Sequence, residues 1–275
     1  MTSANQTETI NGVPLKFTLD GPPNAPTVTF AHALSLNLHS WDSQVAAFAE
    51  NYQVLRVDMR GHGGSDPKGG AFSIEDLADD VAALLDHLGI QKTHFVGSSL
   101  GAMVGFALAF NHPKRLASLV FMASQGALPE AGSAAARERI ATMRASDATP
   151  DTTMAAQADA TIARLMHNPK DDGHGERTAL MRDILGDTTL FGQARAYEAI
   201  LNMNYDSRLS EIHTPTLIVA GAEDSSTPSS RMQMYADGIA GARMEIIKEA
   251  GHFPNIDQPN AFNALLNAFV REISA

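Results

Sequence analysis

A serine lies between two glycines in the segment 97–101, which reads Gly-Ser-Ser-Leu-Gly, after an apolar run at 93–96 and before a helix-like run at 102–110. Such a pentapeptide between a strand and a helix forms a sharp turn that presents the serine hydroxyl as a nucleophile. The glycines are needed because side chains two residues from the serine would collide in so tight a turn. We expect Ser99 to attack the substrate and the backbone N–H of Leu100 to stabilise the oxyanion that forms.

A base and an acid follow at the positions where this chemistry needs them. A strand pattern at 216–220 leads into a loop that holds Asp224, and a strand pattern at 244–247 leads into a loop that holds His252. Because ligands bind at the carboxyl ends of parallel strands, we expect both side chains to meet Ser99. His252 would take the proton of the serine hydroxyl during attack, and Asp224 would hold the imidazole in one tautomer.

Other residues bear on these assignments. Glu223 carries the same carboxylate as its neighbour Asp224 and stays an alternative for the acid. His62 lies in a glycine-rich turn after a strand pattern, where a structural role explains it better than a catalytic one. The second donor of the oxyanion hole is assigned to the backbone N–H of Leu34, in the loop after the strand pattern at 27–30.

Alternating strand and helix patterns must position these residues. A hairpin pattern with an Asn-Gly turn opens the chain at 7–19. The later alternation specifies a mostly parallel sheet with helices on both faces. The clearest helix, at 74–88, repeats apolar residues every three or four positions and starts with a capping-box pattern at Ser73 and Asp76. The predicted strands are 27–30, 52–57, 93–96, 116–122, 216–220 and 244–247, and the other predicted helices are 40–50, 102–110 and 260–273.

The alternation stops between residues 125 and 210, where the sequence has helical spacing and no clear strand. We expect an inserted helical cap at 125–210 on an α/β core domain formed by residues 1–124 and 211–275. A cap would lie over Ser99, exclude water and shape the substrate pocket. Breaks between its helices are predicted at Pro129, Pro150, Pro169 and 171–175.

Two sets of cap side chains are candidates for contact with substrate. Packing between helices is the commoner role for any one apolar side chain, and solvation at the surface is the commoner role for any one cation. The apolar set is Met143, Met154, Leu165, Met166, Met181, Leu185, Leu190 and Phe191. The cationic set, which would bind a substrate carboxylate, is Arg137, Arg139, Arg144, Arg164 and Lys170.

Composition excludes several classes of function. The net charge of −11 over 275 residues disfavours nucleic acid and anionic membranes as partners. The absence of cysteine removes disulfides, thiolate metal sites and a cysteine nucleophile. No P-loop, G-x-G-x-x-G or H-E-x-x-H segment occurs, so we expect no cofactor and no metal. No apolar run would span a bilayer or serve as a signal peptide, and we expect a soluble, cytoplasmic protein; a homo-oligomer stays open.

Four segments in order resemble the α/β-hydrolase superfamily along nearly the whole chain: 54–65, 96–101, 221–228 and 251–259. This resemblance implies the α/β-hydrolase fold, with an eight-stranded, mostly parallel sheet and an inserted helical cap, and it favours Asp224 over Glu223 as the acid. A closer resemblance, to the 3-oxoadipate enol-lactone hydrolases, rests on the segments at 39–42, 60–63, 99–101 and 255–259.

The chain departs from this family pattern in three places. Ala33 stands beside the oxyanion donor where many relatives have glycine, and Ala102 stands after the elbow where a second glycine is frequent. The cap lacks tryptophan, since Trp41 is the only one in the chain. The two alanines would either narrow the site or be compensated by packing, and the missing tryptophan concerns the substrate more than the chemistry.

We therefore expect a cofactor-independent serine hydrolase that opens a small carboxylic ester or lactone through an acyl-enzyme. The resemblance favours 3-oxoadipate enol-lactone as the substrate. A general carboxylesterase and a cofactor-free perhydrolase or haloperoxidase-like enzyme are alternatives, although methionine often takes the place of Leu100 in the latter. An alternative of another class is a small-molecule receptor of this fold, with an intact triad and slow turnover.

Overall fold

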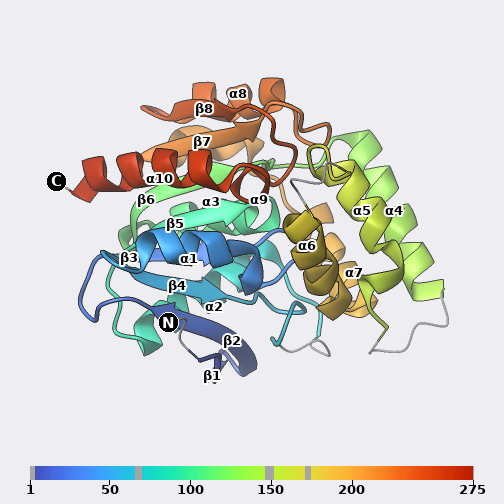
Figure 1. Cartoon of the computed structure of the whole chain (residues 1–275), viewed down its shortest axis with the longest axis horizontal. Helices are drawn as coiled ribbons and strands as arrows, with labels where there is room; N and C mark the ends of the chain where they lie inside the picture. Colours follow the sequence, from blue (N-terminus) through green and yellow to red (C-terminus); the bar gives the residue numbers. More distant parts are fainter. Residues whose placement is uncertain (1–3, 66–69, 146–151, 171–174, 275) are drawn as a thin grey trace.

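An eight-stranded sheet runs through the molecule in the order β1-β2-β4-β3-β5-β6-β7-β8 (Figure 1). The computed structural model describes residues 4–65, 70–145, 152–170 and 175–274. β1 pairs with β2 and β2 with β4 in antiparallel register, and the remaining neighbours are parallel. The predicted mostly parallel sheet is confirmed. The strands are β1 Gln6–Ile10, β2 Val13–Asp20, β3 Thr27–Ala31, β4 Gln53–Val57, β5 Thr93–Ser98, β6 Leu116–Met122, β7 Thr216–Gly221 and β8 Arg243–Ile247.

The first two strands form the hairpin that the Asn-Gly pair predicts. Asn11 has a φ of 50° and Gly12 a φ of 78°. Two successive residues with positive φ match the twist of the flanking strands in a two-residue hairpin turn. The turn sets the register of β1 on β2. Strand β2 pairs in turn with β4, so the hairpin lies at the edge of the parallel strands.

Helices cover both faces of the sheet, and each face has its own hydrophobic cluster. One cluster joins α1 and α10 to the sheet through Trp41, Phe48 and Phe262, and the other joins α2, α3 and α8 to the opposite face. Because both faces are covered, β3, β5 and β7 are buried along their whole length. These helices are α1 Asp42–Phe48, α2 Ile74–His87, α3 Leu100–Asn111, α8 Ser229–Gly238, α9 Pro254–Asp257 and α10 Pro259–Ser274.

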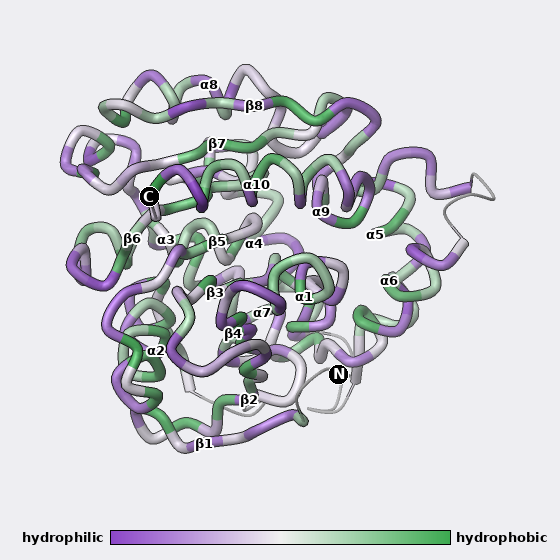
Figure 2. The backbone as a smooth tube through the Cα atoms, turned by 60° about the vertical axis from the view of Figure 1, so that its left-hand side comes forward, coloured by the Kyte–Doolittle hydropathy of each residue, from purple (hydrophilic) through white to green (hydrophobic). Residues whose placement is uncertain are grey.

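Helix α2 shows how local sequence sets these elements. Ser73 accepts a hydrogen bond from the backbone N–H of Asp76, and the Asp76 carboxylate accepts one from the Ser73 N–H. This capping box satisfies two N–H groups that the helix itself leaves free. Figure 2 shows hydrophilic and hydrophobic residues alternating along α2, as expected of a helix with one face on the core.

Two helices differ from the predictions. The predicted helix at 40–50 is shorter, because a 3₁₀ turn, η1 Leu38–Trp41, precedes α1. Helix α8 is absent from the predictions because only Met232 and Tyr235 among its 10 residues are buried, too few to set a helical period.

The segment between β6 and β7 is helical and gathers to one side of the sheet (Figure 1). Pro129 directly precedes α4, and Pro169 lies between α5 and α6, as predicted for breaks. Pro150 and residues 171–174 lie outside the described residues. The described elements are α4 Glu130–Ala145, η3 Met154–Gln157, α5 Ala158–Leu165, α6 Gly175–Asp187, α7 Leu190–Leu201 and the 3₁₀ turn η5 Asp206–Glu211.

Helix α7 touches the loop after β4 through two glycines. Gly192, in the first turn of α7, lies so close to Gly61 that a methyl group on Gly192 would overlap the Gly61 carbonyl oxygen. Gly186, near the end of α6, faces open space instead. Gly192 therefore permits the close approach of α7 to Gly61, whereas no close contact requires a glycine at position 186.

We expect Gly192→Ala to lower the free energy of unfolding by about 1–3 kcal/mol, because the added methyl group forces α7 away from the loop. Gly186→Ala is the matched control. It adds the same methyl group to a helix and is expected to be neutral or to raise stability by up to about 1 kcal/mol. Denaturant unfolding of both variants checks this. Equal stabilities would show that the approach at Gly61 is not a packing constraint.

Candidate functional site

Ser99 sits on a strained turn between the last residue of β5 and the first residue of α3. Its φ is 49° and its ψ −108°, a conformation that non-glycine residues rarely adopt. A methyl group on Gly97 would collide with the backbone of Gly101, and one on Gly101 would collide with the carbonyl of Ala31. The glycines therefore allow helix α3 to start directly against β3 and β5.

Three hydrogen bonds hold this turn in place. The Ser99 N–H donates to the Met122 carbonyl at 2.9 Å, and the Ser124 hydroxyl donates to the Ser99 carbonyl at 2.7 Å. The Gly101 N–H donates to the His32 carbonyl at 3.0 Å. The surroundings thus fix a backbone geometry that would otherwise relax.

His252 and Asp224 form a hydrogen-bonded pair beside this turn. The distance from His252 Nδ1 to Asp224 Oδ2 is 2.8 Å. The carboxylate also accepts from the Ser226 N–H at 2.8 Å and from the Thr227 hydroxyl at 2.6 Å. Burial raises the pKa of Asp224, but the hydrogen bonds from His252 and Thr227 outweigh it and keep this pKa below its ordinary value. The carboxylate is therefore ionised and oriented toward the imidazole.

Glu223, the alternative acid, has a different partner. Its Oε2 accepts the N–H of Ala250 at 2.9 Å, which links the loop after β7 to the loop after β8. Its neighbour Asp224, not Glu223, contacts His252. Of the two adjacent carboxylates, Glu223 therefore bonds to the backbone of the neighbouring loop, and Asp224 bonds to the imidazole of His252.

The loop of His252 is tied to the end of helix α5. The His252 N–H donates to the Leu165 carbonyl at 2.7 Å. The last carbonyls of a helix lack partners inside the helix, so this bond satisfies one of them. The Asp257 carboxylate accepts the N–H of Gly251 at 2.8 Å and that of His167 at 3.1 Å. The chain at Leu165 and His167 is thus fixed against the histidine loop, which is far away in sequence.

The loop after β3 orients the peptide that joins Ala33 to Leu34. The Ala33 carbonyl accepts from the Leu36 N–H at 3.1 Å and lies 2.8 Å from His32 Nδ1. Because a trans peptide holds its C=O and N–H in opposite directions, these contacts turn the Leu34 N–H the other way. Within the described residues, neither this N–H nor that of Leu100 has a hydrogen-bond acceptor.

Helices α6 and α7 support this loop through Ser35, whose φ is 69°. The Thr188 hydroxyl donates to the Ser35 carbonyl at 2.6 Å, and the Gln193 side-chain amide donates to the Ser35 hydroxyl at 2.7 Å. The position of the Leu34 N–H therefore depends on the helical segment as well as on the sheet.

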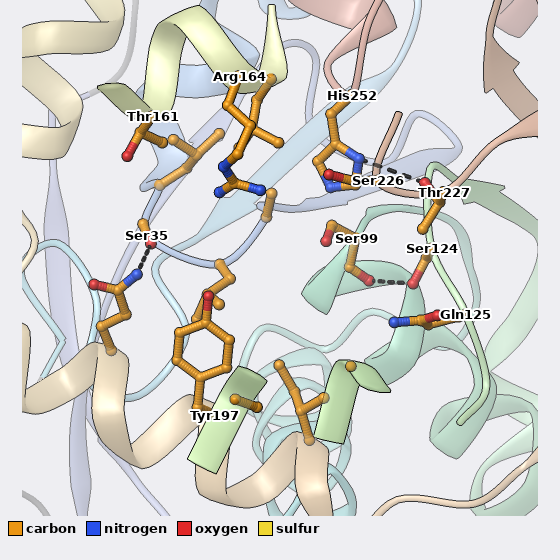
Figure 3. Close-up of a pocket in the computed structure, with 18 of the residues that line it drawn as sticks. Ser35, Ser99, Ser124, Gln125, Thr161, Arg164, Tyr197, Ser226, Thr227 and His252 are labelled. Atoms are coloured by element: carbon orange, nitrogen blue, oxygen red, sulfur yellow. Dashed lines mark hydrogen bonds between the residues drawn. The ribbon is translucent and has the colours of Figure 1, made fainter. Parts of the chain in front are cut away.

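Ser99 and His252 face one cavity of about 300 Å³ (Figure 3). Ser99, His252 and Leu34 line it from the sheet side, and side chains from α4, α5 and α7 line it from the other. No hydrogen bond joins Ser99 to His252 among the described residues. Catalytic hydrogen bonds of this kind often form only when a substrate is bound. The volume suits a small organic molecule.

Residues 26–259 match the family described as the alpha/beta hydrolase fold. The chain belongs to the α/β-hydrolase family. It is 31% identical over 268 residues to 3-oxoadipate enol-lactonase 2 of Acinetobacter baylyi, covering 98% of this chain and 97% of that enzyme. It is 29% identical over 253 residues to the putative carbamate hydrolase RutD of Stutzerimonas stutzeri, covering 89% of this chain and 91% of that protein.

A solved structure supports the same placement. The enol-lactonase from Burkholderia xenovorans LB400 matches this chain with a TM-score of 0.89 and 29% sequence identity, over 97% of this chain and 100% of that one. The resemblance to the α/β-hydrolases and the enol-lactonases is confirmed, and the protein is a hydrolase.

The structure of this α/β-hydrolase sorts the predicted cap contacts. Leu165 and Leu185 line the cavity. The cavity lining omits the remaining apolar candidates, and most of them pack between helices: Met154, Met166, Met181 and Leu190 are buried in one cluster, and Met143 packs against it. Phe191 is 37% exposed and lies under the guanidinium of Arg195. Of the cationic candidates, Arg139 and Arg164 line the cavity.

Several lining residues were missed by sequence reasoning. Ser124, Gln125 and Tyr197 line the cavity, as does Thr161. No pattern in the sequence singles them out, because they come from a loop and from helix faces whose orientation depends on packing. Ala33 packs against the helical segment and also lines the cavity, whereas Ala102 lies in the core and does not line it.

The described residues contain no group of three or more His, Cys, Asp or Glu side chains arranged to hold a metal ion. None of their helices is both long and apolar enough to cross a membrane.

A buried pair of histidines lies beneath the loop after β3. The rings of His32 and His62 are 5.0 Å apart, and His32 Nε2 accepts the Met59 N–H at 3.0 Å. Burial lowers the pKa of His32 to about 4. Burial first, and then the proximity of His32, lower the pKa of His62 to about 3. His62 is 1% exposed and does not line the cavity, which agrees with a structural role.

We expect the stability of this α/β-hydrolase to fall on acidification because of His62. The unfolded chain binds a proton at this residue near its ordinary pKa of about 6.5, whereas the folded chain does not until a pH of about 3. The advantage in unfolding free energy of the wild type over His62→Gln should shrink by up to about 1.4 kcal/mol per pH unit below pH 6.5. Urea unfolding of both proteins between pH 7 and 5 measures this. Parallel stability curves would contradict a neutral buried imidazole.

Proposed function

We propose that this α/β-hydrolase cleaves a small carboxylic ester or lactone through an acyl-enzyme, with Ser99 as nucleophile, His252 as base and Asp224 as acid. The 2.8 Å hydrogen bond between His252 and Asp224, in the cavity that Ser99 lines, carries this proposal. We also propose that residues 125–210 act as its cap, on a core formed by residues 1–124 and 211–275. The lining of the cavity by α4, α5 and α7 supports the cap.

The first half of the reaction forms the acyl-enzyme. His252 Nε2 accepts the hydroxyl proton as Ser99 Oγ attacks the carbonyl carbon, and the carbonyl oxygen becomes an oxyanion. Asp224 stabilises the imidazolium through its bond to Nδ1. The tetrahedral intermediate collapses, the bond from the carbonyl carbon to the ester oxygen breaks, and the imidazolium returns its proton to the leaving oxygen.

The second half regenerates the serine. His252 takes a proton from water, and the hydroxide attacks the acyl carbon. Collapse of this intermediate breaks the bond to Ser99 Oγ, which recovers its proton from the imidazolium, and a carboxylic acid leaves.

The oxyanion of both intermediates is assigned to the N–H groups of Leu34 and Leu100. Both lack acceptors among the described residues, and Leu100 opens helix α3, where the helix dipole favours negative charge. A preformed pair of donors costs no reorganisation when the charge develops.

3-Oxoadipate enol-lactone is the substrate that we propose. The two enol-lactonases similar to this chain support it. An enol is a better leaving group than an alkoxide, so ring opening asks less of His252 as an acid than the cleavage of an alkyl ester. The small cavity suits a five-membered ring with one substituent.

The two adjacent carboxylates give a matched test of the acid. Asp224→Asn should fold normally and lose activity on the order of 10³- to 10⁴-fold, because the amide no longer holds the reactive tautomer of His252. Glu223→Gln keeps an oxygen for the Ala250 N–H and should retain near-wild-type activity. Hydrolysis rates of p-nitrophenyl acetate measure both. The opposite ranking would move the acid to Glu223.

Opening of 3-oxoadipate enol-lactone by the purified protein tests the substrate. We expect fast multiple turnover, lost about a millionfold in Ser99→Ala. Hydrolysis of p-nitrophenyl esters without lactone opening would keep the serine mechanism and discard the substrate. Tight lactone binding with slow turnover would point to a receptor, and near-wild-type activity of Ser99→Ala would refute the nucleophile.

A further inference from the structure

Two arginines of the cap reach the cavity that holds Ser99. Arg164 lies one residue before the end of α5, and Arg139 lies in α4. In Figure 3 the Arg164 guanidinium and the Tyr197 hydroxyl extend into the same space, across from Ser99 and His252. Arg139 donates to that hydroxyl at 2.9 Å. The wall opposite the nucleophile therefore carries two positive charges and a phenol.

These two arginines differ from other arginines of the cap in their partners. Other cap arginines do form ion pairs: Arg144 with Glu198, and Arg182 with Asp159 at 2.6 Å. Within the described residues, no Asp or Glu forms an ion pair with Arg139 or Arg164. Asp224 acts on Arg164 only through space, and its charge is already engaged by His252. The two guanidiniums are therefore available to an anion from outside the protein.

The proximity of these cations has an electrostatic cost. Desolvation lowers the pKa of the Arg164 guanidinium, and the positive charge of Arg139 lowers it further. Two like charges at the wall of a cavity destabilise each other unless an anion lies between them or beside them. A carboxylate would relieve this repulsion, and the planar guanidinium binds it through two parallel hydrogen bonds.

The backbone next to Arg164 is tied to the loop of the catalytic base. The next residue, Leu165, accepts the N–H of His252 at 2.7 Å. An anion on the Arg164 guanidinium would lie in the same cavity as Ser99 and His252, which is what the positioning of a substrate requires.

We propose that Arg164, Arg139 and the Tyr197 hydroxyl form a subsite for a carboxylate at the end of the substrate remote from the scissile ester. The inference rests on the serine hydrolase function proposed above and assigns the residues that recognise the free carboxylate of such a substrate. The preferred substrates are esters or lactones that already carry one carboxylate, and their hydrolysis yields dicarboxylates. A neutral ester of the same length lacks this contact and binds in several orientations.

A matched pair of substrates tests the subsite. Mono-p-nitrophenyl adipate carries a free carboxylate, and methyl p-nitrophenyl adipate has the same chain and leaving group without the charge. We expect Arg164→Gln to lower kcat/KM for the anionic ester about 10- to 100-fold, mostly through KM, and to change that for the neutral ester less than threefold. Arg164→Lys should recover part of the loss, since it restores the charge without the planar fork.

Arg137→Gln is the control. Arg137 lies two residues before Arg139 in α4, is exposed and does not line the cavity. Like Arg164→Gln, this variant removes one positive charge from the cap, and it should change kcat/KM for neither ester. Equal losses for both esters in Arg164→Gln would overturn the subsite and assign the arginine a general role in the site. The absence of a loss for either ester would overturn it as well.

Binding of adipate to Ser99→Ala, measured by calorimetry, tests the subsite without turnover. A double variant with Ser99→Ala and Arg164→Gln should bind adipate at least tenfold more weakly than Ser99→Ala alone. The double variant with Arg137→Gln should bind adipate as tightly as Ser99→Ala alone. Equal affinities in all three proteins would overturn the subsite. If the wild type cleaves neither ester, the proposed function fails, and the adipate affinities still decide whether the anion site exists.

Discussion

The left-handed backbone of Ser99 is the constraint on which the rest of the structure depends. Such a conformation costs about 1–3 kcal/mol and persists only where its surroundings determine it completely. Here the buried parallel strands supply that determination, because β5 delivers the chain to the turn and β6 holds it through the Met122 carbonyl. Helix α3 can start at once only because Gly101 lets it touch Ala31 in β3. The close packing of the central strands therefore serves to hold the Ser99 turn, which lies at the carboxyl end of β5.

The loops around Ser99 are held by contacts that cross between sequence-distant parts of the chain. Ser35 is fixed by Thr188 and Gln193, and the histidine loop by Leu165 and Asp257. Hydrogen bonds therefore join the proposed cap to the loop of the proposed oxyanion donor Leu34 and to the loop of the proposed base. These bonds explain how loops, which are usually the most mobile parts of a fold, can present reacting groups with fixed geometry.

Much of this arrangement could be predicted from the sequence, and the limit has a physical cause. The buried strands and α2 carry strong local signals, namely uninterrupted apolar runs and a capping box at Ser73, so their positions were predicted to within a few residues. Helix α8 lacked such a signal. The pairing of His252 with Asp224 followed from the rule that parallel strands end at one edge. Periodicity could not predict which side chains of the helical segment reach the cavity. Leu165 lines the cavity and its neighbour Met166 is buried in a hydrophobic cluster, and only the packing of the helices decides between them.

The hydrogen bond between the Leu165 carbonyl and the His252 N–H limits how this scaffold can be redesigned. The carbonyl is free to accept because α5 ends there, and Gly251 leaves room for it because it has no side chain. A cap transplanted from another protein would therefore have to end a helix at the same place and with the same direction, or the histidine loop would lose its support. The specificity of this hydrolase is better altered by exchanging side chains on the helices of the proposed cap than by exchanging the whole segment.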